Sequence, residues 1–157
     1  MVAWNKLKII VHTTETENYL YTNSFDIEGG NFSKAGTIAT GIKSILKELG
    51  FPNDVVRKSA IVSYEAEINI VSYARKGIVT LTVTSKNVEI DVTDEGPGIP
   101  DVELARKQGY STANQQIREM GFGAGMGLYN IDCYSDKFDI SSEVNKGTFL
   151  KIIINIP

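Results

Sequence analysis

The sequence has little of what disulfides and zinc sites need. Its 157 residues include one cysteine, Cys133, and one histidine, His12. A lone cysteine excludes an internal disulfide, and one histidine with one cysteine is too few for a conventional His/Cys zinc site. We therefore expect a protein of a reducing compartment, the cytoplasm.

Long apolar runs and an excess of positive charge are also absent. No stretch approaches the roughly 20 apolar residues that cross a bilayer, and the opening MVAWNKLKII lacks the long apolar core of a signal peptide. The 16 basic and 19 acidic side chains give a net charge of −3 without a basic run. We expect neither a membrane protein nor a nucleic-acid-binding protein.

Two helices are predicted in the first half of the chain. Residues 33–49 carry apolar side chains at helical spacing, and Gly50 follows as a stop signal. The second helix is predicted from Asn53 or Asp54, one of which would cap it, to about Ala74.

Strands are predicted in adjacent pairs. Residues 7–13 and 19–27 form the first two strands, as a hairpin or as two edge strands, and residues 137–142 and 148–156 form the last pair. Residues 79–92 alternate apolar and polar side chains around the turn SKN, which is typical of a hairpin. We therefore expect one domain over 1–157: a two-layer α/β sandwich of the α+β type, with a mostly antiparallel sheet covered on one face by helices.

The segment between the last two pairs is less regular. A short helix is predicted at DVELARKQG, residues 101–109, and an irregular polar stretch at residues 110–125. Another helix is predicted from near Met126 to about Tyr134.

One polar pair interrupts the second helix. Glu65 and Asn69 are four residues apart, so they share a helix face. A solvated helix face explains such a pair on its own. The alternative is a base beside a metal ligand, because a carboxylate can polarise a nucleophile and an amide oxygen suits Mg²⁺.

A glycine-rich stretch, DEGPGIP, follows a predicted strand that ends at Asp94. The carboxylate can accept two hydrogen bonds, and Gly96 and Gly98 remove side chains where a planar ligand would approach the backbone. The alternative is a strand end followed by a helix start near Pro100.

A second glycine-rich stretch, GFGAGMGLYNI, precedes a predicted helix. Its glycines occupy every second position: Gly121, Gly123, Gly125 and Gly127. Bare N–H groups in such a loop can wrap an anion, and the helix start adds its positive end. A flexible loop or close helix packing is the alternative. Farther on, Gly147 and Thr148 open the last strand, where the hydroxyl would reach a ligand beside Asp94 if the two strands are neighbours.

In this order, the four motifs resemble the nucleotide-binding boxes of the GHKL ATPase superfamily, the Bergerat fold of DNA gyrase, Hsp90 and histidine kinases. Glu65 and Asn69 are similar to its N box. DEGPG, GAGMG and GT are similar to its three glycine-containing boxes, at residues 94–98, 123–127 and 147–148. The match runs from about residue 30 to the C-terminus.

Size points to one branch of this superfamily. Gyrase and Hsp90 relatives carry further domains, for which 157 residues leave no room, and His12 lies in a predicted strand rather than on the dimerisation helix of a histidine kinase. The chain thus resembles the small bacterial anti-sigma factor/serine-threonine protein kinase family. ELARKQGYSTA before the glycine loop is closest to its stressosome switch-kinase type.

The resemblance implies binding of ATP and Mg²⁺. Glu65 would be the general base acting on a protein serine or threonine hydroxyl, and Asn69 would hold Mg²⁺. Asp94 would accept the adenine amino group, above a pocket floor made by Gly96 and Gly98.

It also implies an ATP lid at about 102–125. Gly123, Gly125 and Gly127 would wrap the phosphates. Ser111 and Thr112 would approach the terminal phosphate, and Thr148 would support adenine.

The implied partner is a STAS-domain protein that receives the phosphate. The alternatives are sequestration of a sigma factor, and a nucleotide-gated adaptor that transfers nothing. Family analogy also implies a homodimer. Two features depart from the switch-kinase pattern: NQQIREM lengthens the lid, and Tyr129 stands where GLP is common.

Overall fold

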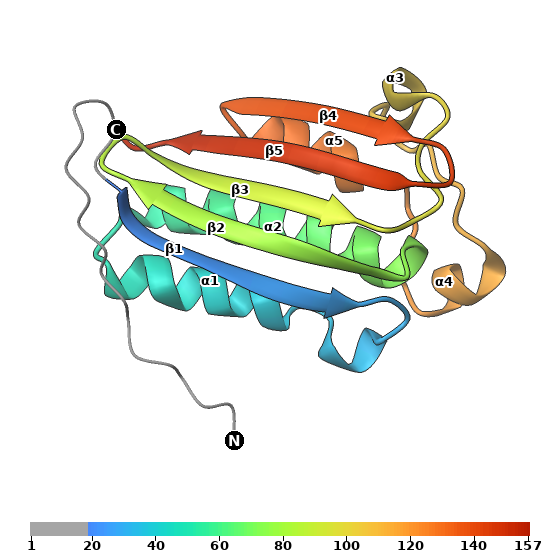
Figure 1. The fold of residues 1–157 in the computed structure, drawn as a ribbon, viewed down its shortest axis with the longest axis horizontal. Coiled ribbons are helices and arrows are strands. Elements are labelled where there is room, and N and C mark those ends of the chain that lie inside the picture. The colour runs from blue at the N-terminus through green and yellow to red at the C-terminus, as the bar shows by residue number, and fades with distance from the viewer. Residues whose placement is uncertain (1–18) are drawn as a thin grey trace.

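The computed structural model describes residues 19–157 (Figure 1). The strand predicted at residues 7–13, and His12 with it, lies outside the described residues. Within residues 19–157, no helix is both long enough and apolar enough to span a membrane.

The strands within residues 19–157 form one five-stranded sheet in the order β1-β2-β3-β5-β4, and every neighbouring pair is antiparallel. The predicted antiparallel sheet is therefore confirmed. Their bounds are Tyr19–Glu28 (β1), Lys76–Thr84 (β2), Asn87–Asp94 (β3), Lys137–Glu143 (β4) and Gly147–Asn155 (β5). Because β5 inserts between β3 and β4, the ends of β3 and β5 that carry Asp94 and Thr148 meet at one end of the sheet.

Helices cover one face of the sheet, which confirms the predicted two-layer sandwich (Figure 1). The helices are η1 (Phe32–Lys34, a 3-10 turn), α1 (Thr37–Glu48), α2 (Asn53–Tyr73), α3 (Val102–Ala105), α4 (Gln115–Glu119) and α5 (Gly127–Tyr134). Of these, α1, α2 and α5 pack behind the sheet, whereas the short α3 and α4 lie beyond the end of the sheet at which β3 stops (Figure 1).

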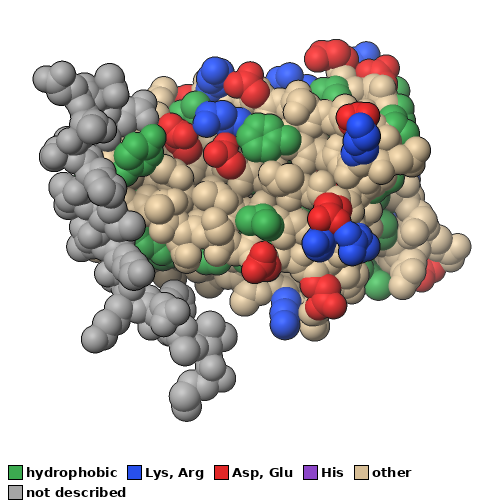
Figure 2. Space-filling model, in the orientation of Figure 1, with side chains coloured by type: hydrophobic (Ala, Val, Ile, Leu, Met, Phe, Trp, Pro, Cys, Tyr) green, Lys and Arg blue, Asp and Glu red, His purple; other side chains and the backbone are tan. Residues whose placement is uncertain are grey.

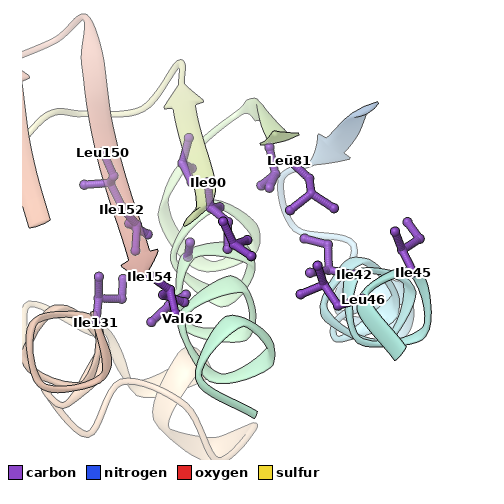
Figure 3. Close-up of a cluster of buried hydrophobic side chains, with 14 of the residues drawn as sticks. Ile42, Ile45, Leu46, Val62, Leu81, Ile90, Ile131, Leu150, Ile152 and Ile154 are labelled. Carbon is purple, nitrogen blue, oxygen red and sulfur yellow. The ribbon is translucent and has the colours of Figure 1, made fainter. Parts of the chain in front are cut away.

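The core lies between the two layers, and it follows the alternation that the sequence shows (Figure 3). The inward side chains of the three central strands are Val79, Leu81, Val83, Val88, Ile90, Val92, Leu150, Ile152 and Ile154. They meet Ile42 and Leu46 of α1, Val62 of α2 and Ile131 of α5, all fully buried.

The other face of the sheet carries scattered charges of both signs (Figure 2). On this face, Lys151 of β5 lies 3.3 Å from the Glu89 carboxylate and 3.7 Å from that of Asp91, both on β3. Such half-exposed pairs contribute little stability each. They keep the open face polar.

The start of α1 differs from the prediction. The helix begins at Thr37 rather than at residue 33, because Phe32–Lys34 form a separate 3-10 turn and Gly36 adopts a left-handed conformation, with φ of +89°. The buried carboxylate of Glu67, on α2, accepts the backbone N–H groups of Gly36, Ile38 and Ala39 at 3.0, 3.3 and 3.1 Å. A side chain distant in sequence thus caps the helix.

The predicted cap of α2 is wrong. Pro52 occupies the N-cap position, no side chain caps the helix, and Asn53 is already helical. The Asp54 carboxylate instead lies 3.0 Å from Arg57 and 3.1 Å from Lys58, in ion pairs one turn along the helix.

The segment that follows DEGPGIP also differs in detail. The helix predicted at residues 101–109 is only Val102–Ala105, and Asp101 caps it by accepting Leu104 N–H at 2.9 Å. The stretch predicted as irregular contains α4, where Asn114 accepts Ile117 N–H at 3.0 Å. Asn is a favoured N-cap residue, so Asn114 is the sequence signal for the start of this helix.

Candidate functional site

A cavity of about 480 Å³ lies between α2, the end of β3 and the segment from α3 to the start of α5. Ten of the eleven predicted site residues line it: Glu65, Asn69, Asp94, Gly98, Ser111, Thr112, Gly123, Gly125, Gly127 and Thr148. The exception is Gly96. Motifs that are far apart in the sequence therefore meet at one site.

The deep wall of the cavity is apolar. It is lined by Ala66 and Ile70 of α2, Val92 of β3 and Leu150 of β5, all of which also belong to the buried core. A concave apolar site with a few placed polar groups is the usual form of a small-molecule pocket. This wall suits a flat, weakly polar ring.

Asp94 provides the polar group at that end. It is the last residue of β3, and its Oδ1 accepts Thr148 N–H at 3.2 Å, across from β5. Burial raises the pKa of the Asp94 carboxyl, although the backbone N–H groups of Thr148 and Gly96 act against this rise. The two strands are therefore neighbours, which is the condition under which Thr148 would reach a ligand beside Asp94.

Ser142, which sequence reasoning missed, ties this end of the site together. Its Oγ accepts Ile99 N–H at 2.8 Å, donates to the Gly147 carbonyl at 3.0 Å and lies 2.8 Å from Thr148 Oγ1. In the bond between the two hydroxyls, either Ser142 or Thr148 can be the donor. A serine on an alternating strand such as β4 gives no signal that would have identified it.

The glycines around Asp94 let three segments approach closely. Gly98 has φ of +70°, and a Cβ there would lie 2.2 Å from the Glu143 carbonyl oxygen. A Cβ on Gly147 would lie 1.9 Å from the Asp94 carbonyl oxygen. Gly96 packs against Asp94 itself, because its Cβ would be 2.8 Å from Asp94 Oδ1. Gly96 thus lets the loop fold back on Asp94 and is not part of the cavity floor.

Glu65 and Asn69 form the opposite end of the site. Both are half-buried on α2 and face the start of α5, where a Cβ on Gly127 would lie 3.2 Å from Asn69 Oδ1 and 3.5 Å from Glu65 Oε2. Asn130 of α5 donates to Glu65 Oε1 at 2.7 Å. The pair therefore faces the cavity and α5, and it is not simply a solvated helix face.

The acidic groups of the described residues do not gather into a metal site of their own, since no three His, Cys, Asp or Glu side chains are clustered. What the cavity offers is the Asn69 amide oxygen beside Gly127. That donor set fits Mg²⁺, which is commonly held by one or two protein groups together with substrate phosphates and water.

The glycine loop is folded against the segment before it. Gly123 and Gly125 have φ of +80° and +74°, and a Cβ on Gly125 would lie 2.4 Å from the Gly109 carbonyl carbon. Gly109 N–H donates to the Gly125 carbonyl at 2.8 Å. Side chains at Gly123 and Gly125 would push the glycine loop away from the earlier part of the predicted lid, which contains Gly109.

Two further contacts fasten this lid. The ring of Phe122, which lines the cavity, stacks on Phe32 of η1. Arg106, just after α3, donates to Asp132 of α5 at 3.0 Å and lies over the Phe138 ring. Ser111, which lies between Arg106 and Phe122 along the chain, accepts the N–H of Ala113 two residues later at 3.1 Å.

Comparisons with known proteins agree with this arrangement. The sequence profile described as histidine kinase-, DNA gyrase B-, and HSP90-like ATPase matches residues 60–157. The serine/threonine-protein kinase RsbT of Bacillus subtilis is 32% identical over 116 residues, covering 71% of this chain and 80% of the kinase. The anti-sigma F factor of Geobacillus stearothermophilus is 33% identical over 111 residues, covering 69% of this chain and 64% of that factor.

Proposed function

Because the chain belongs to the family of histidine kinase-, DNA gyrase B-, and HSP90-like ATPases, we propose that it is an ATP-dependent protein kinase. Its cavity would bind ATP with Mg²⁺ and pass the γ-phosphate to a serine or threonine of a partner protein. The observation that carries this proposal is the placing of Glu65 beside Asn69 at the wall of the cavity, next to the glycine loop.

Adenine would lie at the Asp94 end. The carboxylate accepts hydrogen bonds only, so it suits the exocyclic amino group of adenine. Val92 and Leu150 give the ring an apolar wall. The Thr148 hydroxyl, which lies 2.8 Å from Ser142 Oγ, keeps a free lone pair that can accept a hydrogen bond from a ligand or a bridging water.

The phosphates would lie at the other end, against the glycine loop. Gly123 and Gly125 line the cavity without side chains, and α5 begins at Gly127 with its unpaired N–H groups and positive dipole end. Ser111 and Thr112 line the same part of the lid. Asn69 would hold Mg²⁺, which neutralises charge that develops on the phosphates.

Glu65 would accept the proton of the attacking hydroxyl. The hydroxyl oxygen forms a bond to the γ-phosphorus as the bond to the β,γ-bridging oxygen breaks, and ADP leaves. Most of the catalysis in such a transfer comes from positioning and charge stabilisation, and a general base adds typically about 10²- to 10⁴-fold.

The acceptor we propose is a STAS-domain protein, in a pathway where binding partners are exchanged on phosphorylation. A relative that is an anti-sigma factor favours a second role, sequestration of a sigma factor. A third possibility is an adaptor that binds ATP and transfers nothing. The proposed locale is the cytoplasm, with the chain acting as a homodimer.

The test has two steps, binding and then transfer. Calorimetry should detect Mg-ATP binding to the wild type, and Asp94→Asn should weaken it by about 1–3 kcal/mol because the adenine amino group loses its acceptor match. Wild type that is folded but binds no ATP contradicts the nucleotide site.

Transfer is then followed with γ-labelled ATP and the purified STAS-domain proteins of the same genome. Glu65→Ala should keep ATP binding and lose labelling, whereas Glu48→Ala, at an exposed position of α1, should label as wild type does. ATP binding without labelling of any acceptor would remove the kinase role, and co-purification of a sigma factor would then support sequestration.

A further inference from the structure

Asn130 lies in the stretch GFGAGMGLYNI but outside the glycine box GAGMG, and its side chain reaches the proposed base. We propose that Asn130 is a positioning residue, which holds the Glu65 carboxylate so that one oxygen faces the cavity. This inference rests on the proposed kinase function.

The hydrogen bond has a definite direction. An ionised carboxylate only accepts, so the Asn130 amide must present its nitrogen, and Nδ2 lies 2.7 Å from Glu65 Oε1. A bond to a charged acceptor at this distance is among the stronger hydrogen bonds in proteins. Oε1 is therefore the oxygen that is held.

The second oxygen is the one that faces the reaction site. Glu65 Oε2 lies 3.5 Å from the Cβ position of Gly127, and Gly127 lines the cavity next to Asn69. With Oε1 bound by Asn130, the proton of an acceptor hydroxyl would be taken by Oε2. The hydrogen bond thus selects which oxygen acts as the base.

The backbone around Asn130 is fixed. Ile131, the next residue on α5, is fully buried in the core, and Asn130 N–H donates to the Met126 carbonyl at 2.7 Å. Gly127, Asn130 and Ile131 share the face of α5 that packs on α2, as their spacing of three and four residues requires. The amide therefore reaches Glu65 from a rigid support.

Asn130 acts through Glu65 rather than on ATP. Glu65 and Asn69 line the cavity, whereas Asn130 is not among the described residues that line it. Its removal should lower the rate of transfer and leave nucleotide affinity unchanged. A residue that only supports the fold of the pocket would lower both.

The test compares three replacements of one side chain. Asn130→Leu and Asn130→Asp keep the branched arrangement of four side-chain heavy atoms but cannot donate to an ionised Glu65, whereas Asn130→His presents a ring N–H near the position of the amide nitrogen. Cys133→Ser, at an exposed position of α5, is the control. Each variant is measured for Mg-ATP affinity by calorimetry, and for single-turnover transfer of γ-labelled phosphate to the STAS-domain acceptor.

The Leu and Asp variants should lose about 10- to 100-fold in transfer rate, a part of what a general base contributes, with Mg-ATP affinity within about 2-fold of wild type. The His variant should recover at least about tenfold over Leu. Equal rates in the Leu variant and the wild type would overturn the inference, as would a loss of ATP affinity that parallels the loss of rate, or a His variant as slow as Leu. Wild type that binds ATP but transfers nothing is a different result, and it overturns the kinase proposal together with the role of Asn130.

Discussion

The ring of Phe122 stacks on the ring of Phe32, with centroids 5.6 Å apart and planes inclined by 23°. Phe122 belongs to the proposed ATP lid and lines the cavity, whereas Phe32 belongs to η1, which leads into α1. At Phe122, the lid is therefore held to the segment that leads into the layer of helices. Opening the lid must break this stack.

Phe32→Ala should therefore speed nucleotide release. An aromatic pair contributes about 0.5–1.5 kcal/mol beyond its buried area, which corresponds to roughly 2- to 10-fold in the dissociation rate. Stopped-flow displacement of a fluorescent ATP analogue measures this rate. Phe149→Ala, on the open face of the sheet, is the matched control and should release the analogue at the wild-type rate. Unchanged release from Phe32→Ala would show that the stack does not hold the lid.

Gly98 and Gly30 have nearly the same backbone conformation, with φ of +70° and +76°, in different surroundings. An alanine at Gly30 meets no atom within 4 Å, so it should cost only the backbone strain, about 1–2 kcal/mol. An alanine at Gly98 also meets the Glu143 carbonyl, so we expect at least twice that loss in the free energy of unfolding, with weaker ATP binding. Urea denaturation of both variants tests this, and equal losses would mean that the loop moves aside without cost.

Asp94→Asn should change how stability depends on pH. The pKa of the Asp94 carboxyl is raised in the folded protein, so the folded state holds the proton more firmly than the unfolded chain does. The wild type should therefore lose stability relative to Asp94→Asn as pH rises from the ordinary carboxyl value, about 3.9, through the raised one. Above that window the difference in stability should be at its most favourable for the asparagine variant, which should bind ATP less well. Urea denaturation at a series of pH values measures the difference, and a difference that stays constant or has the opposite slope contradicts the expectation.

Glu67→Ala should destabilise the fold without touching the cavity. The side chain is 2% exposed and satisfies three backbone N–H groups at the start of α1. We expect a loss of about 2 kcal/mol or more in the free energy of unfolding, at or above the upper range for a lost helix cap. Thermal and urea denaturation measure it. Glu48→Ala, exposed at the end of the same helix, should change stability by less than about 0.5 kcal/mol.

Most of the fold could be predicted because its signals are local. The alternation of apolar and polar residues predicts the strands β2, β3 and β5 and their inward faces. The helical spacing of apolar residues predicts α1 and α2. What could not be predicted depends on contacts between distant residues. Glu67 caps a helix that begins 30 residues before it, from Thr37, and no local pattern reveals such a cap.

The candidate site divides in the same way. Site residues that belong to short motifs could be predicted, and they line the cavity: Asp94, Gly98, Gly127, Glu65 and Asn69. Gly96 belongs to the same motif but packs against Asp94, which depends on how the loop folds. Asn130 reaches Glu65 on a helix 65 residues earlier in the chain, and Ser142 lies on an alternating strand where a serine belongs to no motif, so neither side chain had a local signal.

The α2 helix presents two carboxylates, two residues apart, to different neighbours: Glu65 to the cavity and α5, and Glu67 to the start of α1. Successive helical residues are about 100° apart around the axis. The direction in which each glutamate points therefore depends on the number of residues between it and the buried positions that anchor the helix. Point substitutions on the exposed side of α2 do not change this number of residues. Inserting or deleting one residue between Val62 and Glu65 would turn both acids away from their partners at once. Over evolutionary time, this helix should therefore vary in composition while keeping its length.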